Sequence, residues 1–179
     1  MRTLDDSHKS VIENLETITR MKECSEEVER YLVERATAVF ERCSREHPSV
    51  FGKVIERNEY GNRYINMPLT VMEKDAPFVL GVEQVWTAGI LGLPSAEPLT
   101  YYVYSLVSPT AARNLQAAAP APRGFVPQGN RDSYIHAMAL SPMSKDDFLD
   151  PAKVERHFAD PLQTLCEWCN TYQLQLLGA

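Results

Sequence analysis

The chain has 179 residues, of which 24 are acidic and 18 basic, so its formal net charge is −6. An apolar content of 44% and a charged content of 23% are typical of globular proteins and exclude collagen-like, low-complexity and wholly disordered chains. The acidic balance, with no cluster of basic residues, argues against nucleic acid and anionic membranes as partners. A chain of this length can bury one well-packed core.

The N-terminal sequence is charged within its first six residues and has no apolar run of signal-peptide length. No stretch of about 18 uncharged apolar residues is present that could span a bilayer. We therefore expect a soluble, cytoplasmic protein. Its four cysteines, Cys24, Cys43, Cys166 and Cys169, are too few for a disulfide scaffold and are predicted to be reduced thiols.

Two helices are predicted before Pro48. Ser7 can cap the first, and Ser25 can open the second, which has acids in its first turn and bases in its last. The apolar positions lie at helical spacing: Val11, Ile12, Leu15 and Ile18 in the first helix, and Val28, Tyr31, Leu32, Ala36, Val39, Phe40 and Cys43 in the second. We interpret residues 1–22 as a helical arm and residues 23–179 as a single α+β domain.

After Pro48 the apolar period changes from that of a helix to that of a strand. The predicted strands are Ser49–Arg57, Arg63–Glu73, Phe78–Ala88, Leu99–Val107 and Tyr134–Leu140. Pro68 cannot donate a ladder hydrogen bond, so its strand should lie at an edge or carry a bulge. Strand 99–107 is apolar on both sides, which predicts helices on both faces of the sheet or a partner on one.

The remaining segments are predicted to be helices and one loop. Ser108-Pro109 starts a short helix to about Ala118, and the proline-rich segment 117–133 forms a long surface loop. Asp150-Pro151 and Asp160-Pro161 each place an N-cap acid before a proline, so two C-terminal helices are expected.

The resulting fold class is α+β, with N-terminal helices, an antiparallel meander of four to five strands and C-terminal helices packed on the sheet. In element order alone, this resembles the RWD and ubiquitin-conjugating-enzyme domains. No His-Pro-Asn element and no cysteine stand between Leu99 and Asp150, so that resemblance implies at most a non-catalytic relative. A small acidic α+β chain also resembles the dimeric chaperones of bacterial type III secretion.

The motifs of common catalytic and cofactor sites are missing. The chain has no G-x-S-x-G, no phosphate-binding glycine loop and no calcium-loop spacing. Cys166-Glu-Trp-Cys169 has the spacing of a redox or zinc pair, but it lies inside a predicted helix, where packing thiols are the simpler interpretation. We expect no catalytic residue, no metal site and no cofactor.

The first functional hypothesis is a non-catalytic protein–protein interaction module, which could serve as an adaptor, chaperone or assembly subunit and could form homo-oligomers. It would use an aromatic sheet face and the helical arm. Trp86, Tyr102 and Tyr104 are its predicted contact residues, because aromatic side chains dominate interface hot spots.

The alternative is a small-molecule-binding or enzymatic domain with a pocket between sheet and helices. Tyr64, Tyr102 and His136 would then be its polar groups, beneath the 117–133 loop. His136 is expected to share a strand face with Tyr134 and Met138, and a half-buried structural histidine is the competing interpretation. A third hypothesis is a zinc-stabilised module.

Overall fold

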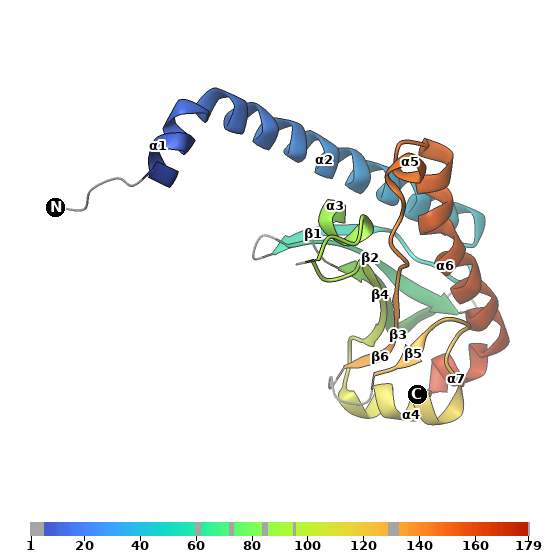
Figure 1. The fold of residues 1–179 in the computed structure, drawn as a ribbon. Coiled ribbons are helices and arrows are strands. Elements are labelled where there is room, and N and C mark those ends of the chain that lie inside the picture. Colours follow the sequence, from blue (N-terminus) through green and yellow to red (C-terminus); the bar gives the residue numbers. More distant parts are fainter. Residues whose placement is uncertain are drawn as a thin grey trace.

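The computed structural model describes residues 6–59, 62–71, 74–83, 86–94, 96–128 and 133–178, and the statements below concern these residues. Along the chain the elements are α1 (Asp6–Glu13), α2 (Leu15–Glu46), β1 (Ile55–Glu59), β2 (Asn62–Val71), β3 (Lys74–Glu83), α3 (Trp86–Ile90), β4 (Thr100–Ser105), α4 (Pro109–Ala118), β5 (Val126–Pro127), β6 (Tyr134–Ala139), α5 (Lys145–Phe148), α6 (Pro151–Thr171) and α7 (Gln173–Gly178). Figure 1 shows their arrangement.

The predicted α+β class is confirmed. All strand pairs are antiparallel, and the sheet has six strands in the order β1-β2-β3-β4-β6-β5. The strand that was not expected is β5, a two-residue strand inside the predicted 117–133 loop. Strand β2 is internal, and its register shifts between Pro68 and Thr70, so the bulge expected at this proline is present.

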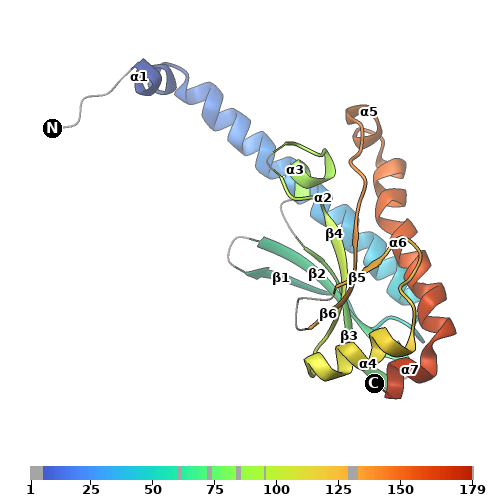
Figure 2. The same cartoon turned by 60° about the horizontal axis from the view of Figure 1, so that its bottom comes forward.

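Helices α2 and α6 lie side by side over one face of the sheet (Figures 1 and 2). Their exposed edges are joined by Glu155 of α6, which accepts hydrogen bonds from Arg35 at 2.9 Å and from Arg42 at 3.3 Å. Beneath them, the ring of Phe40 stacks on that of Tyr101 in β4, with centroids 5.8 Å apart. The Tyr101 hydroxyl donates to the carbonyl of Phe158 in α6 at 2.9 Å, so one tyrosine contacts both long helices.

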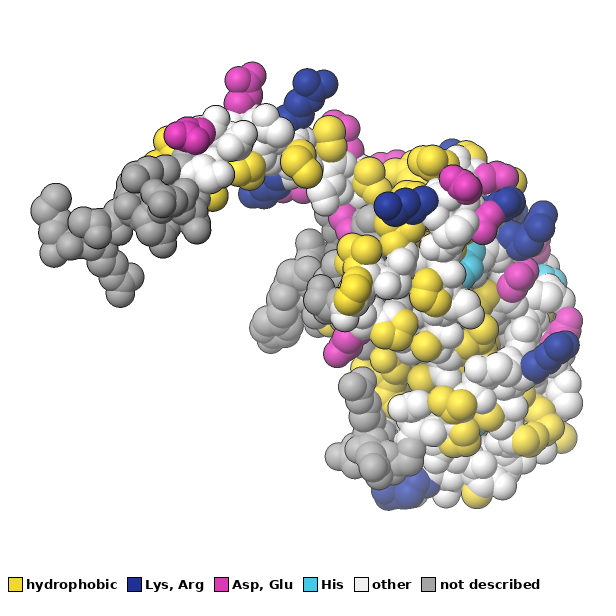
Figure 3. All heavy atoms as spheres, in the orientation of Figure 1, with side chains coloured by type: hydrophobic (Ala, Val, Ile, Leu, Met, Phe, Trp, Pro, Cys, Tyr) yellow, Lys and Arg dark blue, Asp and Glu magenta, His cyan; other side chains and the backbone are white. Residues whose placement is uncertain are grey.

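Helix α2 extends well beyond this contact. Every described side chain from Ser10 to Glu27 is exposed, whereas Leu32 and Ala36 are fully buried. We call residues 6–27 the arm. It projects away from the rest of the chain, which we call the body (Figure 3). None of the described helices is both long and apolar enough to cross a membrane.

Three predicted helix starts are wrong. Ser7, expected to cap the first helix, lies inside α1, which already includes Asp6. Ser25 lies inside the continuous helix α2, because residues 15–46 contain no glycine or proline that would stop a helix. For the same reason α2 runs unbroken across residue 22, the predicted end of the arm. Pro161 lies inside α6, although it costs a helical hydrogen bond. The buried stripe of Val154, Phe158, Leu162 and Leu165 continues across it, so packing against α2 keeps the helix intact.

The C-terminal end predicted for strand 78–88 is also wrong. Strand β3 stops at Glu83, and residues 86–90 form the short helix α3. Alternating residues between 78 and 88 fit a strand, but the ladder with β4 ends where Glu83 pairs with Thr100.

We predict that Tyr101→Phe lowers the free energy of unfolding by about 1 kcal/mol, because a buried hydrogen bond is lost while the ring stack remains. Urea denaturation should report a lower midpoint with an unchanged slope. Tyr172→Phe, at a partly exposed ring in the same layer, is the control and should change the midpoint less. Equal midpoints for wild type and Tyr101→Phe would contradict this role.

Candidate binding face

The second face of the sheet carries a group of tyrosines that the strand registers bring together. Side chains alternate along β4, so that Tyr101 and Val103 are buried in the core while Tyr102 and Tyr104 are half-buried on the other face. Residues paired across an antiparallel ladder share a face. Four pairings therefore extend this face across the sheet: Arg57 with Tyr64, Asn66 with Gly81, Gly81 with Tyr102, and Tyr104 with Tyr134.

A hollow of about 200 Å³ lies over the centre of this face. Its described lining residues are Arg57, Tyr64, Asn66, Gly81, Tyr102, Tyr104 and Tyr134, which we call the tyrosine face. Gly81 accounts for the space, because it places no side chain between Asn66 and Tyr102 in the middle of the sheet. A Cβ at this position would lie 2.6 Å from Asn66 Oδ1 and 3.3 Å from Tyr104 Cε1.

Three of the four tyrosine rings pack against one another. The centroids of Tyr102 and Tyr134 are 4.9 Å apart, with the rings at 73°, an edge-to-face arrangement. Tyr104 and Tyr134 are 5.8 Å apart at 40°. Such pairs hold the rings in defined positions, so a partner would meet a surface that is already ordered.

Tyr134 reaches this face through a bulge in β6. Val103 pairs with His136 and the next residue, Tyr104, pairs with Tyr134, which leaves Ile135 without a partner in β4. The carbonyl of Ile135 instead accepts a hydrogen bond from the Gln116 side chain at 2.6 Å and another from the Gln128 backbone at 3.0 Å. The expectation that Tyr134 and His136 share a face is therefore wrong.

The structure brings Tyr64, Tyr102 and Tyr104 together but places His136 on the opposite side of the sheet. His136 is buried against Trp168 of α6, with ring centroids 5.6 Å apart. Neither ring nitrogen of His136 has a hydrogen-bond partner among the described residues. Burial lowers the pKa of His136 from 6.5 to about 4, so the ring is neutral at physiological pH.

The other predicted contact residue, Trp86, is the first residue of α3, and its side chain lies outside the described part of the structure. Arg57, Asn66, Gly81 and Tyr134 were missed as site residues. Counting alternate positions in each predicted strand would have found the first three once the strand register was known. Tyr134 depends on the bulge, which leaves no local pattern in the sequence.

Three of the four cysteines pack in the core or at its edge, whereas Cys24 is exposed on α2. Cys166 and Cys169 are buried in α6, and Cys43 is half-buried in α2. Burial raises the pKa of Cys43 to about 12 and also raises the pKa values of Cys166 and Cys169, so these thiols stay protonated. Among the described residues, no three histidine, cysteine or acidic side chains are grouped as a metal ion would require.

The tyrosine face has the chemistry of a binding surface. Its described lining residues offer aromatic rings, phenol hydroxyls, one amide and one guanidinium, and they include no thiol, histidine or carboxylate. The arrangement can therefore hold a ligand by stacking and hydrogen bonding.

Comparison with known proteins adds no assignment, since no protein family, curated protein or solved structure was found to match this chain.

We predict that acid destabilises the protein partly through His136. Below pH 6.5 the unfolded state binds a proton at this ring, whereas the folded state binds it only near pH 4. Stability is therefore lost as the pH falls from 6.5 to 4, by about 3 kcal/mol in total from this residue.

His136→Leu should remove that part of the pH dependence and also relieve two unpaired ring nitrogens. The measurement is urea denaturation of both proteins from pH 7.5 to 4.5, read as the difference in unfolding free energy at each pH. Carboxylates titrate equally in both proteins and cancel. A difference that does not change with pH would show that His136 is not the group responsible.

Proposed function

We propose that the protein is a non-catalytic protein-binding module, whose tyrosine face holds an extended segment of a partner protein. The observation that carries this proposal is the group of four tyrosines around the hollow over Gly81, on the face of the sheet opposite α2 and α6. Tyrosine and arginine are among the residues most enriched at interface hot spots. The proposal includes an adaptor, a chaperone or an assembly subunit as the biological role.

The size of the hollow favours a segment of a protein over a free metabolite. Sites for small molecules usually enclose about 300–1,000 Å³, so that most of the ligand's surface is buried. A space of about 200 Å³ is smaller, and it suits one ring or one branched side chain that projects from a longer chain. The rest of such a segment would lie across the neighbouring rings of Tyr102 and Tyr104.

The composition of the face also favours an extended segment. An extended chain leaves its backbone carbonyls free to accept hydrogen bonds. Arg57 donates through its guanidinium and Asn66 through its amide, and both border the hollow. Aromatic grooves that bind extended, proline-containing peptides combine flat rings and donors in this way.

The test is selection from a displayed library of random linear peptides, followed by fluorescence anisotropy with each enriched peptide. We expect binding to the wild type and at least a tenfold weaker affinity for Tyr102→Ala, since truncating a hot-spot ring costs about 2 kcal/mol. Gly81→Ala should weaken binding in the same way, because the added methyl group takes up space beside the hollow and displaces the Asn66 amide. Gln163→Ala, on the exposed side of α6, is the matched control and should bind as the wild type does.

Thermal denaturation of each variant separates lost binding from lost folding. The alternative, a small-molecule-binding domain, would be favoured if no peptide were enriched and a metabolite raised the melting temperature of the wild type but not of Gly81→Ala. Enriched peptides that bind Tyr102→Ala and Gly81→Ala normally would overturn the proposal for this face.

A further inference from the structure

The arm carries a concentration of exposed apolar side chains that the body does not cover. Five large apolar residues of the arm are between 42 and 67% exposed: Val11, Ile12, Leu15, Ile18 and Met21. The other described residues of this kind are scattered through the body. A row of apolar side chains along one projecting helix marks an interaction site more clearly than the same residues placed singly.

The spacing along α2 indicates that another helix is the occupant. Starting at Leu15, the side chains directed to one side follow intervals of three and four residues: Leu15, Ile18, Met21, Ser25, Val28 and Leu32. We call this row the seam. A repeat close to 3.5 residues gives a narrow stripe that fits a second helix packed lengthwise, whereas a broader stripe would be needed to lie on a sheet.

The seam is continuous with the protein's own core. Leu32, its last member, is completely buried in the body, and Val28 is half-buried, whereas the members before them are exposed. The side of α2 that packs in the core of the body therefore continues along the arm, where its side chains are exposed to solvent. In its C-terminal half, α2 has a helical neighbour in α6, but α6 begins only at Pro151 and does not reach the arm.

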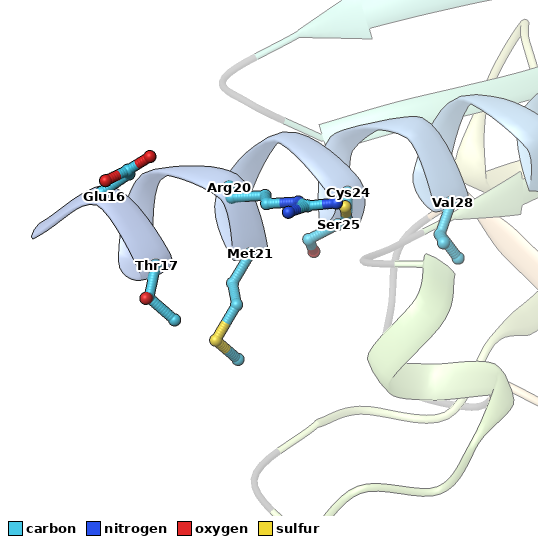
Figure 4. A pocket seen from close by; sticks show the side chains of 7 residues that line it. All are labelled: Glu16, Thr17, Arg20, Met21, Cys24, Ser25 and Val28. Carbon is cyan, nitrogen blue, oxygen red and sulfur yellow. The ribbon is translucent and has the colours of Figure 1, made fainter. Parts of the chain in front are cut away.

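The space beside the arm is bounded on one side only, by α2 itself. A hollow of about 560 Å³ lies along α2, and all its described lining residues belong to that helix: Glu16, Thr17, Arg20, Met21, Cys24, Ser25 and Val28. Figure 4 shows two seam residues, Met21 and Val28, pointing to the same side of the helix, together with Thr17, which lies beside the seam. Side chains from another chain would supply the opposite wall.

We propose that the arms of two copies of this chain pack together along the seam and make the protein a homodimer. A second copy is the occupant that brings an identical seam of matching length, and a twofold pair of equal surfaces is the commonest way in which proteins self-associate. This inference is independent of the tyrosine face, which lies on the sheet.

The apolar area of the seam is sufficient for a specific dimer. Its three exposed large apolar side chains, Leu15, Ile18 and Met21, each have on the order of 100 Å² left to bury, so two arms contribute on the order of 600 Å² of apolar surface. Because apolar atoms make up roughly 60% of an interface, the total is on the order of 1,000 Å². That reaches the area of about 1,000 Å² that a biological interface needs and indicates a dimer of modest affinity.

The experiment is light scattering behind size exclusion, together with sedimentation equilibrium, on the full chain at micromolar to submillimolar concentrations. We expect a dimer for the wild type. Ile18→Glu should give a monomer under the same conditions, with the dissociation constant raised on the order of 100-fold or more, because the new carboxylates would be buried in the seam. Thr19→Glu adds the same charge one residue along, off the seam, and should remain a dimer.

The position of the arm makes this test separable from folding. Ile18 contacts the solvent rather than the body core, so the melting transition of the body in Ile18→Glu should match that of Thr19→Glu. Met21→Glu, at the most exposed of the five positions, is the second variant should Ile18→Glu prove insoluble. A monomeric wild type throughout the concentration range, or a dimer that survives both seam substitutions, would overturn the proposal.

Discussion

The contact of Tyr101 with Phe40 and with the carbonyl of Phe158 joins the sheet to both long helices, and much of the molecule depends on it. Its ring lies under α2 and its hydroxyl reaches α6, so a strand and two helices are fixed at one point. Because the hydroxyl is completely buried and cannot bond to water, stability requires its hydrogen bond to the Phe158 carbonyl as well as the packing of the ring. Burial raises the pKa of Tyr101 far above its usual value, so the hydroxyl remains a donor.

The orientation of Tyr101 also decides what the opposite face presents. Side chains alternate along a strand, so fixing Tyr101 in the core directs Tyr102 and Tyr104 to the opposite face, where they are half-buried. Gly81 then opens a hollow beside them, and the bulge at Ile135 adds Tyr134. One buried contact and one irregular residue thus account for three of the four tyrosines on this face, and Tyr64 of β2 is the fourth.

The tyrosine face and the arm are exposed for different reasons. The tyrosine face is half-buried, ordered by ring contacts and rich in hydrogen-bonding groups, features that suit recognition of another molecule without self-association. The seam is a row of aliphatic side chains that continues the core outward. Contact of such aliphatic side chains with water is unfavourable, and packing against another chain removes that contact.

Local chemistry was sufficient to predict the class of the fold and many of its elements. Helix caps at Ser108 and Asp150, the alternation of the strands and the bulge at Pro68 all appear in the structure. The false starts at Ser25 and Asp160 have one cause. A capping residue makes a helix start favourable, but an apolar stripe that continues through it favours an unbroken helix more strongly.

The sequence by itself determined the α+β class, the antiparallel sheet and the apolar sides of the helices, because these follow from periods of two and 3.6 residues within single segments. Only the tertiary structure decided which side chains meet. His136 and Tyr102 looked like members of one pocket, yet the ladder pairs His136 with Val103 and Tyr102 with Ala137, which places the two side chains on opposite faces of the sheet. Register across strands is set by long-range pairing, so no local pattern contained it.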